Sequence, residues 1–126
     1  MHKTERQKSD AYGRWAERLA AIYLRCCGYR IISRREKTPF GEIDLMARRR
    51  QAVIFIEVKY RRRKDRLEGS LTPKSQNRIL KAAHYITSRT PEFQKLEQRF
   101  DLIFMAPLGP FSLGYIRHIK DAWRTY

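Results

Sequence analysis

Hydrophobic residues recur every three or four positions in the first part of the chain, a spacing that is typical of an amphipathic helix. Asp10 is a plausible N-cap for this helix, and Gly28 supplies its C-terminal stop. The positions between them that follow the helical period are Trp15, Ala16, Leu19, Ala20, Ile22, Tyr23, Cys26 and Cys27. We therefore expect a helix that ends at Gly28, preceded by a flexible basic arm over residues 1–9.

The pattern then changes to short segments that are rich in β-branched residues and bounded by turn-forming residues. Such segments predict β-strands. Three of them follow one another closely, at 29–35, 42–48 and 52–60, with turn signals at 38–41 and 49–51. Because the connections are short, we expect the three strands to form an antiparallel meander.

A second helix is predicted by Thr72, a good N-cap residue, and by Pro73 at the first helical position. This helix should end at Thr90, which precedes a proline. Two further strands are expected over 100–105 and 113–119. The resulting order α-β-β-β-α-β-β predicts an α/β fold in which helices flank a mixed β-sheet.

The length and charge of the chain limit its organisation and its partners. We expect one domain spanning residues 1–126, because this length suffices for a single core. The 28 lysines and arginines exceed the 13 acidic residues, and the formal net charge is +15. This excess predicts attraction to a polyanion, and we expect nucleic acid, in particular DNA, as the partner. An anionic membrane surface, an acidic protein or a merely solvated surface are the alternatives.

Insertion into a membrane and secretion are not predicted. The longest apolar stretch, 52–56, ends at Glu57 and is far shorter than the roughly 20 residues of a spanning helix. Residues 1–10 are polar and basic and lack the apolar centre of a secretory signal. Cys26 and Cys27 are adjacent, which suits neither a disulfide nor a zinc site. We expect buried thiols and a location in the reducing cytoplasm.

Three charged residues interrupt the apolar meander. Asp44 lies within the second strand, and Glu57 and Lys59 lie near the end of the third. Buried charges cost several kcal/mol unless they are paired or bind a metal. In the predicted hairpin Asp44 and Glu57 lie opposite or diagonal to each other, and such a carboxylate pair favours Mg²⁺ or Mn²⁺. Lys59 could then orient water or stabilise the transition state of phosphodiester hydrolysis. The alternative is that Lys59 forms structural ion pairs with these carboxylates.

Other polar residues leave two interpretations open. Glu17 lies along an apolar stripe, where Gly13 would allow close packing, and it either joins the site or pairs with Arg14 or Arg18 on the helix surface. Gln76 either points towards the ionic end of the sheet or is a boundary residue. Glu42 either joins the acidic cluster or faces solvent. For Asp101 we expect structural pairing with an arginine rather than catalysis.

Five short motifs are distributed along the chain: Gly13-x-x-x-Glu17, Leu24-x-x-x-Gly28-Tyr29, Gly41-Glu42-Ile43-Asp44-Leu45, Phe55-Ile56-Glu57-Val58-Lys59-x-Arg61 and Arg99-Phe100-Asp101. Together they closely resemble the motifs of the YraN-like family, small bacterial proteins regarded as predicted nucleases. That family is similar to archaeal Holliday-junction resolvases and belongs to the restriction-endonuclease-like superfamily. The resemblance implies a mixed sheet with the order α-β-β-β-α-β, in agreement with the pattern above.

The resemblance also implies roles for individual residues. The catalytic set that it implies is Glu17, Asp44, Glu57, Lys59 and Gln76, and Asp44, Glu57 and the carbonyl of Val58 would hold the metal ion. The chain departs from the family pattern in two places. Relatives carry a Lys-Gln pair on the second helix, whereas the lysine here is Lys74, one position further from Gln76. Tyr60 follows Lys59, where relatives usually have a small hydroxyl residue.

The expected function is a Mg²⁺- or Mn²⁺-dependent endonuclease that acts on DNA, in particular on branched or structured DNA. Its phosphate-binding residues would be Arg61, Arg62, Arg63, Lys64 and Lys74. Action on a symmetric junction would require two active sites and hence a homodimer. One alternative is a non-catalytic nucleic-acid-binding protein that retains the nuclease fold. Another is an RNA-binding or ribosome-associated protein with exposed aromatic residues for base stacking.

Overall fold

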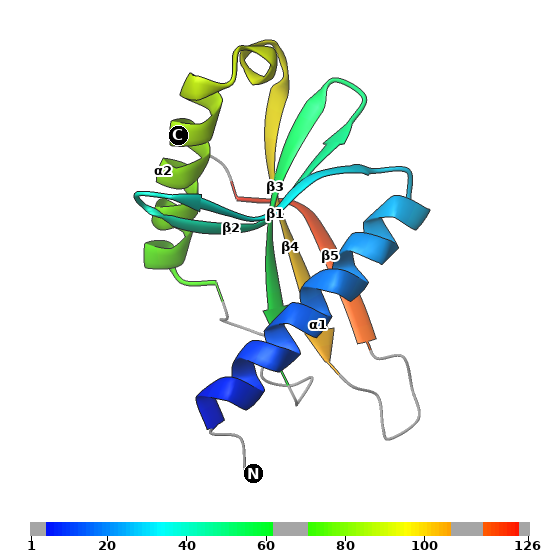
Figure 1. Ribbon diagram of the computed structural model, residues 1–126. Coiled ribbons are helices and arrows are strands. Elements are labelled where there is room, and N and C mark those ends of the chain that lie inside the picture. Colours follow the sequence, from blue (N-terminus) through cyan, green and yellow to red (C-terminus); the bar gives the residue numbers. More distant parts are fainter. Residues whose placement is uncertain (1–4, 62–70, 107–114, 124–126) are drawn as a thin grey trace.

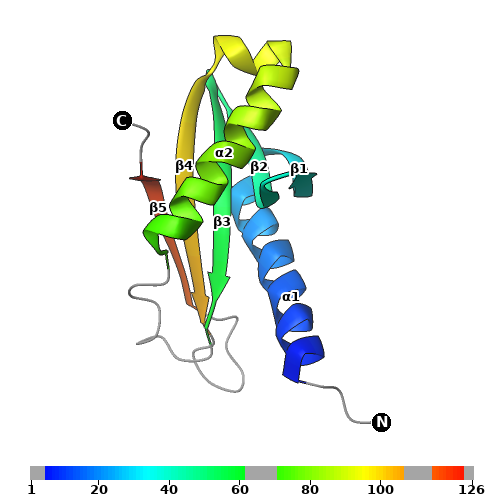
Figure 2. The ribbon, with the colours of Figure 1, turned by 90° about the vertical axis from the view of Figure 1, so that its left-hand side faces the viewer.

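Two helices cover opposite faces of one five-stranded sheet (Figures 1 and 2). The computed structural model describes residues 5–61, 71–106 and 115–123. Its elements are α1 (Glu5–Cys26), β1 (Arg30–Thr38), β2 (Gly41–Arg49), β3 (Ala52–Tyr60), α2 (Pro73–Arg89), the 3₁₀ helix η2 (Pro91–Lys95), β4 (Glu97–Ala106) and β5 (Tyr115–Trp123). The predicted α/β class and the predicted order of helices and strands are confirmed.

The strands lie in the sheet in the order in which they occur in the chain, β1-β2-β3-β4-β5. The first three form the expected antiparallel meander. Strands β3 and β4 are parallel, and α2 makes the crossover that this arrangement requires. Strand β5 returns antiparallel to β4. The sheet is therefore mixed, as the element order predicts.

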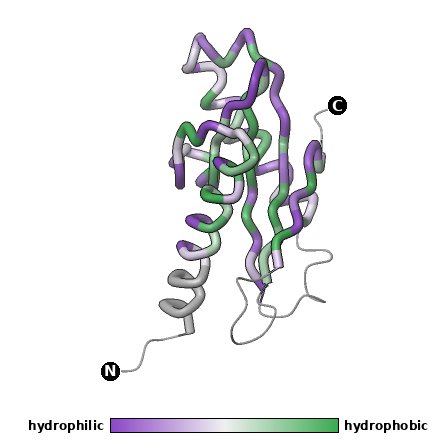
Figure 3. Tube along the Cα trace, turned by 90° about the vertical axis from the view of Figure 1, so that its right-hand side faces the viewer, coloured by the Kyte–Doolittle hydropathy of each residue, from purple (hydrophilic) through white to green (hydrophobic). Residues whose placement is uncertain are grey.

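A hydrophobic layer lies on each face of the sheet, because successive side chains of a strand point to opposite faces. On β3, Ile54 and Ile56 pack with Ala20 and Leu24 of α1, whereas Phe55 belongs to the layer beneath α2. Figure 3 shows hydrophobic stretches within the strands and hydrophilic residues towards their ends. The apolar run of β3 is thus explained by burial on both faces.

The beginning of α1 differs from the prediction. The helix starts at Glu5 rather than at Asp10, so residues 5–9, which we assigned to a flexible arm, are helical. This segment contains neither Gly nor Pro, and Glu, Arg, Gln and Lys are favourable helix residues. The sequence therefore offers no stop signal at its predicted boundary.

The surface of α1 also differs from expectation. The helix buries Ala16, Ala20, Ala21 and Leu24 and leaves Trp15 and Ile22 41% and 53% exposed. The thiols of Cys26 and Cys27, which we expected to be buried, are exposed and free. Cys26 is the last residue of α1, and Cys27 lies in the turn that leads to β1.

The second helix begins as its sequence predicts. The side chain of Thr72 accepts a hydrogen bond from the backbone N–H of Ser75 at 3.1 Å, and Pro73 occupies the first turn. Thr90 is the C-cap. Among the described helices, none is long and apolar enough to cross a membrane.

Candidate active site

The candidate site lies where β2 and β3 separate. Leu45 and Ile56 are the last paired residues of the two strands, whereas β2 continues to pair with β1 as far as Gly41. Beyond this point Asp44 takes the place of a strand partner, because its carboxylate Oδ2 accepts a hydrogen bond from the backbone N–H of Val58 at 2.8 Å. Asp44 is therefore held directly beside the end of β3.

The carboxylate of Asp44 resists ionisation. Burial raises the pKa of Asp44 to about 8, the charge of Glu57 adds to this rise, and the hydrogen bond from Val58 opposes it. The charge of Glu17 raises the pKa further, and that of Lys59 lowers it. The structure thus brings Glu17 and Glu57, two other predicted site carboxylates, within electrostatic range of Asp44, and the described residues provide no ion-pair partner for Asp44.

Glu57 is buried but has cationic neighbours. Its Oε1 lies 3.3 Å from Nζ of Lys59, and 3.7 Å from Nη2 of Arg78 on α2. Side chains alternate between the two faces of β3, so Glu57 and Lys59 lie on the same face as Phe55, which α2 covers. The structural ion pair that we considered for Glu57 and Lys59 is present. Of the two carboxylates Asp44 and Glu57, only Asp44 therefore lacks an ion-pair partner among the described residues.

Arg78 is a site residue that the sequence analysis missed. Besides approaching Glu57, its Nη1 donates a hydrogen bond to the backbone carbonyl of Glu42 at 3.1 Å. A Cβ atom added to Gly41 would lie 2.9 Å from the same nitrogen, and Gly41 has a φ of +128°. The glycine in the Gly-Glu-Ile-Asp motif was the signal for this close approach, because a glycine often marks one.

Glu17 reaches the site from α1 but is occupied by another partner. Its Oε2 accepts a hydrogen bond from Nε of Arg35 on β1 at 2.6 Å. The predicted arginine partner was Arg14 or Arg18 on the same helix, so the partner is different. Within the described part of the chain, no three His, Cys, Asp or Glu side chains form a group that could hold a metal ion.

Two other candidates form no hydrogen bond or ion pair with the carboxylates of Asp44 and Glu57 among the described residues. The amide of Gln76 lies 3.5 Å from the carbonyl of Leu71, at the start of its own helix, and Glu42 is exposed to solvent. Gly13 also lacks the packing role that we expected, because among the described atoms nothing lies within 4 Å of the position of an added Cβ. The placement of Gln76 agrees with a boundary residue.

The predicted phosphate-binding residues are only partly described. Arg61 is half-buried and donates a hydrogen bond to the carbonyl of Tyr60 at 2.9 Å, and Lys74 is exposed in the first turn of α2. Arg62, Arg63 and Lys64 lie outside the described residues.

The donor atoms suit a hard divalent cation. Asp44 and Glu57 offer carboxylate oxygens, which Mg²⁺ and Mn²⁺ prefer. The N–H and C=O groups of one strand residue point to the same side, so the carbonyl of Val58 points to the side on which its N–H meets Asp44. A cation between the two carboxylates would offset the repulsion that raises the pKa of Asp44.

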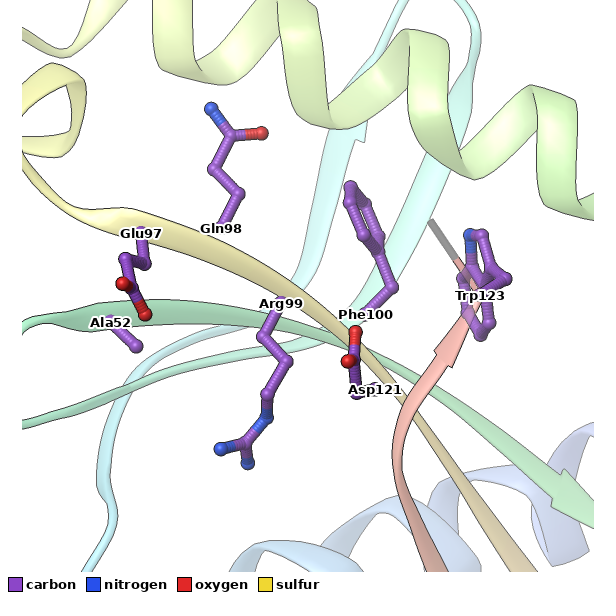
Figure 4. A pocket seen from close by; sticks show the side chains of 7 residues that line it. All are labelled: Ala52, Glu97, Gln98, Arg99, Phe100, Asp121 and Trp123. Carbon is purple, nitrogen blue, oxygen red and sulfur yellow. The ribbon is translucent and has the colours of Figure 1, made fainter. Parts of the chain in front are cut away.

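A separate pocket of about 500 Å³ lies at the other end of the sheet. Figure 4 shows Phe100 and Trp123 on the side of α2 and Arg99 on the opposite side. The pocket also contains Ala52, which is five residues from Glu57 on β3, or roughly 17 Å along an extended strand. This pocket is therefore distinct from the carboxylate site.

Beside that pocket, Asp101 forms the structural pairing that we expected. It is fully buried and accepts two hydrogen bonds from Arg99, both of 2.8 Å, while Nε2 of His118 lies 2.7 Å from its Oδ2. The β4–β5 register shifts at this point, and the backbone N–H of Asp121 donates to Asp101 at 2.9 Å. Burial tends to raise the pKa of Asp101, but these hydrogen bonds lower it below its usual value.

Comparison with known proteins points to one family. The model of the uncharacterised protein family UPF0102 matches residues 16–105. A UPF0102 protein of Parvibaculum lavamentivorans is 43% identical over 109 residues, which cover 86% of this chain and 78% of that protein. One of Nitrobacter winogradskyi is 50% identical over 92 residues, covering 73% and 78%. One of Paramagnetospirillum magneticum is 42% identical over 122 residues, covering 94% and 91%.

Proposed function

The chain belongs to the uncharacterised family UPF0102, the YraN-like family, and we propose that it is a metal-dependent endonuclease that hydrolyses phosphodiester bonds in DNA. The proposed cofactor is Mg²⁺ or Mn²⁺. The proposed substrate is branched or otherwise structured DNA. The net charge of +15 supports a polyanionic substrate.

The observation that carries this proposal is the state of Asp44. Its pKa of about 8 arises from burial and from the charge of Glu57, and no described residue forms an ion pair with it. A purely structural carboxylate in such a place would gain stability from a cationic partner, as Glu57 does from Lys59. The absence of a partner in the described part of the chain is the arrangement expected where a metal ion supplies the positive charge.

The residues have distinct roles in this proposal. Asp44 and Glu57 would hold the cation, and the carbonyl of Val58 would supply a further oxygen ligand. A bound divalent cation would lower the pKa of a water molecule and offset the charge of the phosphate. The ammonium of Lys59, held 3.3 Å from Glu57, would stabilise the negative charge that develops on the phosphate oxygens. The oxygen of a water molecule forms a bond to phosphorus while the ester bond from phosphorus to the leaving oxygen breaks. The proton from the water passes to the leaving oxygen, so the products are a phosphate monoester and a hydroxyl group.

The test compares cleavage by the wild type with cleavage by Asp44→Asn and Glu57→Gln. Linear duplexes and four-way junctions are incubated with Mg²⁺, Mn²⁺ or EDTA, and products are resolved on denaturing gels. We expect metal-dependent cleavage by the wild type and a loss of roughly 100-fold or more in both variants. Glu97→Gln, an exposed carboxylate at the start of β4, is the matched control and should cleave normally.

Circular dichroism should show that all three variants are folded. Equal, salt-sensitive DNA binding by wild type and Asp44→Asn, with no cleavage by either in any metal, would contradict the proposal. That result would instead support a non-catalytic nucleic-acid-binding protein. Cleavage that persists in EDTA would contradict the metal requirement.

A further inference from the structure

A second concentration of charge lies on the α1 side of the carboxylate site. Arg14, Glu17 and Arg18 of α1, together with Arg34 and Arg35 of β1, line a pocket of about 460 Å³, which we call the arginine pocket. Glu17 belongs to this pocket and also acts electrostatically on Asp44. The arginine pocket therefore adjoins the candidate active site, and its residues are separate from the basic residues that the sequence analysis selected.

The charges in the arginine pocket are not balanced. It contains four guanidinium groups and one carboxylate, so its formal charge is 4 − 1 = +3. The carboxylate of Glu17 binds Arg35 at 2.6 Å. Arg14, Arg18 and Arg34 form no ion pair with any described residue, and all three are exposed. The positive charges of these arginines repel one another, and a bound anion would reduce this repulsion.

The backbone of β1 is distorted where it contributes to the pocket. Successive residues of a regular strand point to opposite faces, yet the neighbours Arg34 and Arg35 both line this pocket. Arg35 has a φ of +55°, in the left-handed region that a residue with a side chain rarely adopts. Such strain costs of order 1 kcal/mol and tends to occur at functional sites. Here it coincides with two guanidinium groups in one cavity.

We infer that the arginine pocket binds backbone phosphates of a nucleic acid. The planar guanidinium group donates two parallel hydrogen bonds to phosphate oxygens, which makes arginine well suited to phosphodiesters. The inference rests on the proposed function for its substrate class. The inference adds a direction of binding: the nucleic-acid strand lies along α1 and along β1, the edge strand of the sheet. The phosphate to be cleaved then reaches Asp44 and Glu57 from the side of α1.

The test measures DNA binding without cleavage. The protein carries Asp44→Asn and is kept in EDTA, so that DNA is not cleaved. Fluorescence anisotropy then gives the dissociation constant of a labelled DNA duplex between about 50 and 300 mM salt, a range in which counterion release changes the affinity. The test variant is Arg14→Gln/Arg18→Gln/Arg34→Gln, which leaves the ion pair of Arg35 intact. The control removes three exposed charges elsewhere: Lys81→Gln/Arg117→Gln/Lys120→Gln. Two of these lie on β5, the opposite edge of the sheet.

We expect the arginine-pocket variant to bind DNA at least about ten-fold more weakly near physiological salt, and its salt slope to fall by roughly 2 to 3. The control should change the slope by less than about 1. Equal effects of the two triple variants, with both folded by circular dichroism, would overturn the inference. A mononucleotide that binds the pocket with the same dissociation constant as DNA would also overturn the inference, because the ligand would then be a single phosphate group rather than a nucleic-acid backbone.

These outcomes are separable from those of the proposed function. Loss of DNA binding in the arginine-pocket variant supports the inference even where the wild type cleaves nothing. Metal-dependent cleavage by the wild type, with the arginine-pocket variant binding as the control does, leaves the proposed function standing and removes the inference.

Discussion

The carboxylate of Asp44 accepts the backbone N–H of Val58 at 2.8 Å, in the gap that opens where β2 leaves β3. A strand that ends its pairing normally leaves backbone groups without partners, and here a side chain takes the N–H. The same bond fixes Asp44 next to Glu57. The separation of two strands therefore both exposes the end of β3 and supplies a carboxylate to it.

The stability of the metal-free protein should depend on the ionisation of Asp44. Its pKa is raised in the folded state to about 8 from a usual value of 3.8, so the folded chain binds more protons than the unfolded chain between these values. As far as Asp44 is concerned, the free energy of unfolding should therefore be highest at and below about pH 4. It should fall by up to about 1.4 kcal/mol for each pH unit as the pH rises to 8. Urea unfolding in EDTA across this range measures the effect.

Asp44→Asn removes the titrating group and should flatten this part of the pH profile. Glu97→Gln is the control and should keep the wild-type slope, since Glu97 is exposed. An unchanged slope in Asp44→Asn would show that Asp44 ionises normally in the folded protein.

Binding of a divalent cation should stabilise the fold, because the cation binds ionised carboxylates that the native state holds together. At a concentration of 100 times its dissociation constant, Mn²⁺ should add about 2.7 kcal/mol to the free energy of unfolding. Binding should also strengthen from pH 6 to pH 8, since the cation displaces the proton of Asp44. Differential scanning calorimetry with and without Mn²⁺ measures both effects. A similar thermal shift in Glu57→Gln would place the cation elsewhere.

Gly41→Ala should destabilise the protein by about 1 to 3 kcal/mol. Gly41 has a φ of +128°, and its new Cβ would lie 2.9 Å from Nη1 of Arg78. The displaced Arg78 would lose its bond to the carbonyl of Glu42 and its approach to Glu57. Chemical denaturation measures the loss.

Gly13→Ala is the matched control for this substitution. Gly13 is helical, and its added Cβ meets no described atom within 4 Å. This change should stabilise α1 by about 0.5 to 1 kcal/mol. Equal effects of the two substitutions would contradict the proposed contact between Gly41 and Arg78.

Asp101→Asn should be among the most damaging single substitutions, at about 3 to 5 kcal/mol. It removes the charge that binds Arg99 and His118 in a fully buried position. Because the pKa of Asp101 is lowered, its stabilising contribution is present above the usual carboxyl pKa and is lost as the pH falls below it. Urea unfolding at pH 7 is the measurement. A cost below about 0.5 kcal/mol, as expected for exposed Glu97→Gln, would contradict a structural role.

The order of the helices and strands could be predicted from local signals in the sequence, as could the central motif around Asp44. The apolar run of 52–56 predicted β3, the N-cap and proline at Thr72 and Pro73 predicted α2, and the short turns predicted the meander, because these signals are local. The structural role of Asp101 also followed from residue type. The ion pair of Glu57 with Lys59 was an alternative that the sequence left open, and the structure contains it. Helix α1 began earlier than predicted because no local residue stops it.

The tertiary structure decided which charges are neutralised. Arg35 and Arg78 lie on β1 and α2, far in sequence from the carboxylates Glu17 and Glu57 that they approach, and only the folding of α1 and α2 onto the sheet brings each pair together. The same packing leaves Asp44 with a backbone N–H and without an ion pair among the described residues. Charge compensation depends on distance in space and on burial, and spacing along the chain determines neither across separate elements.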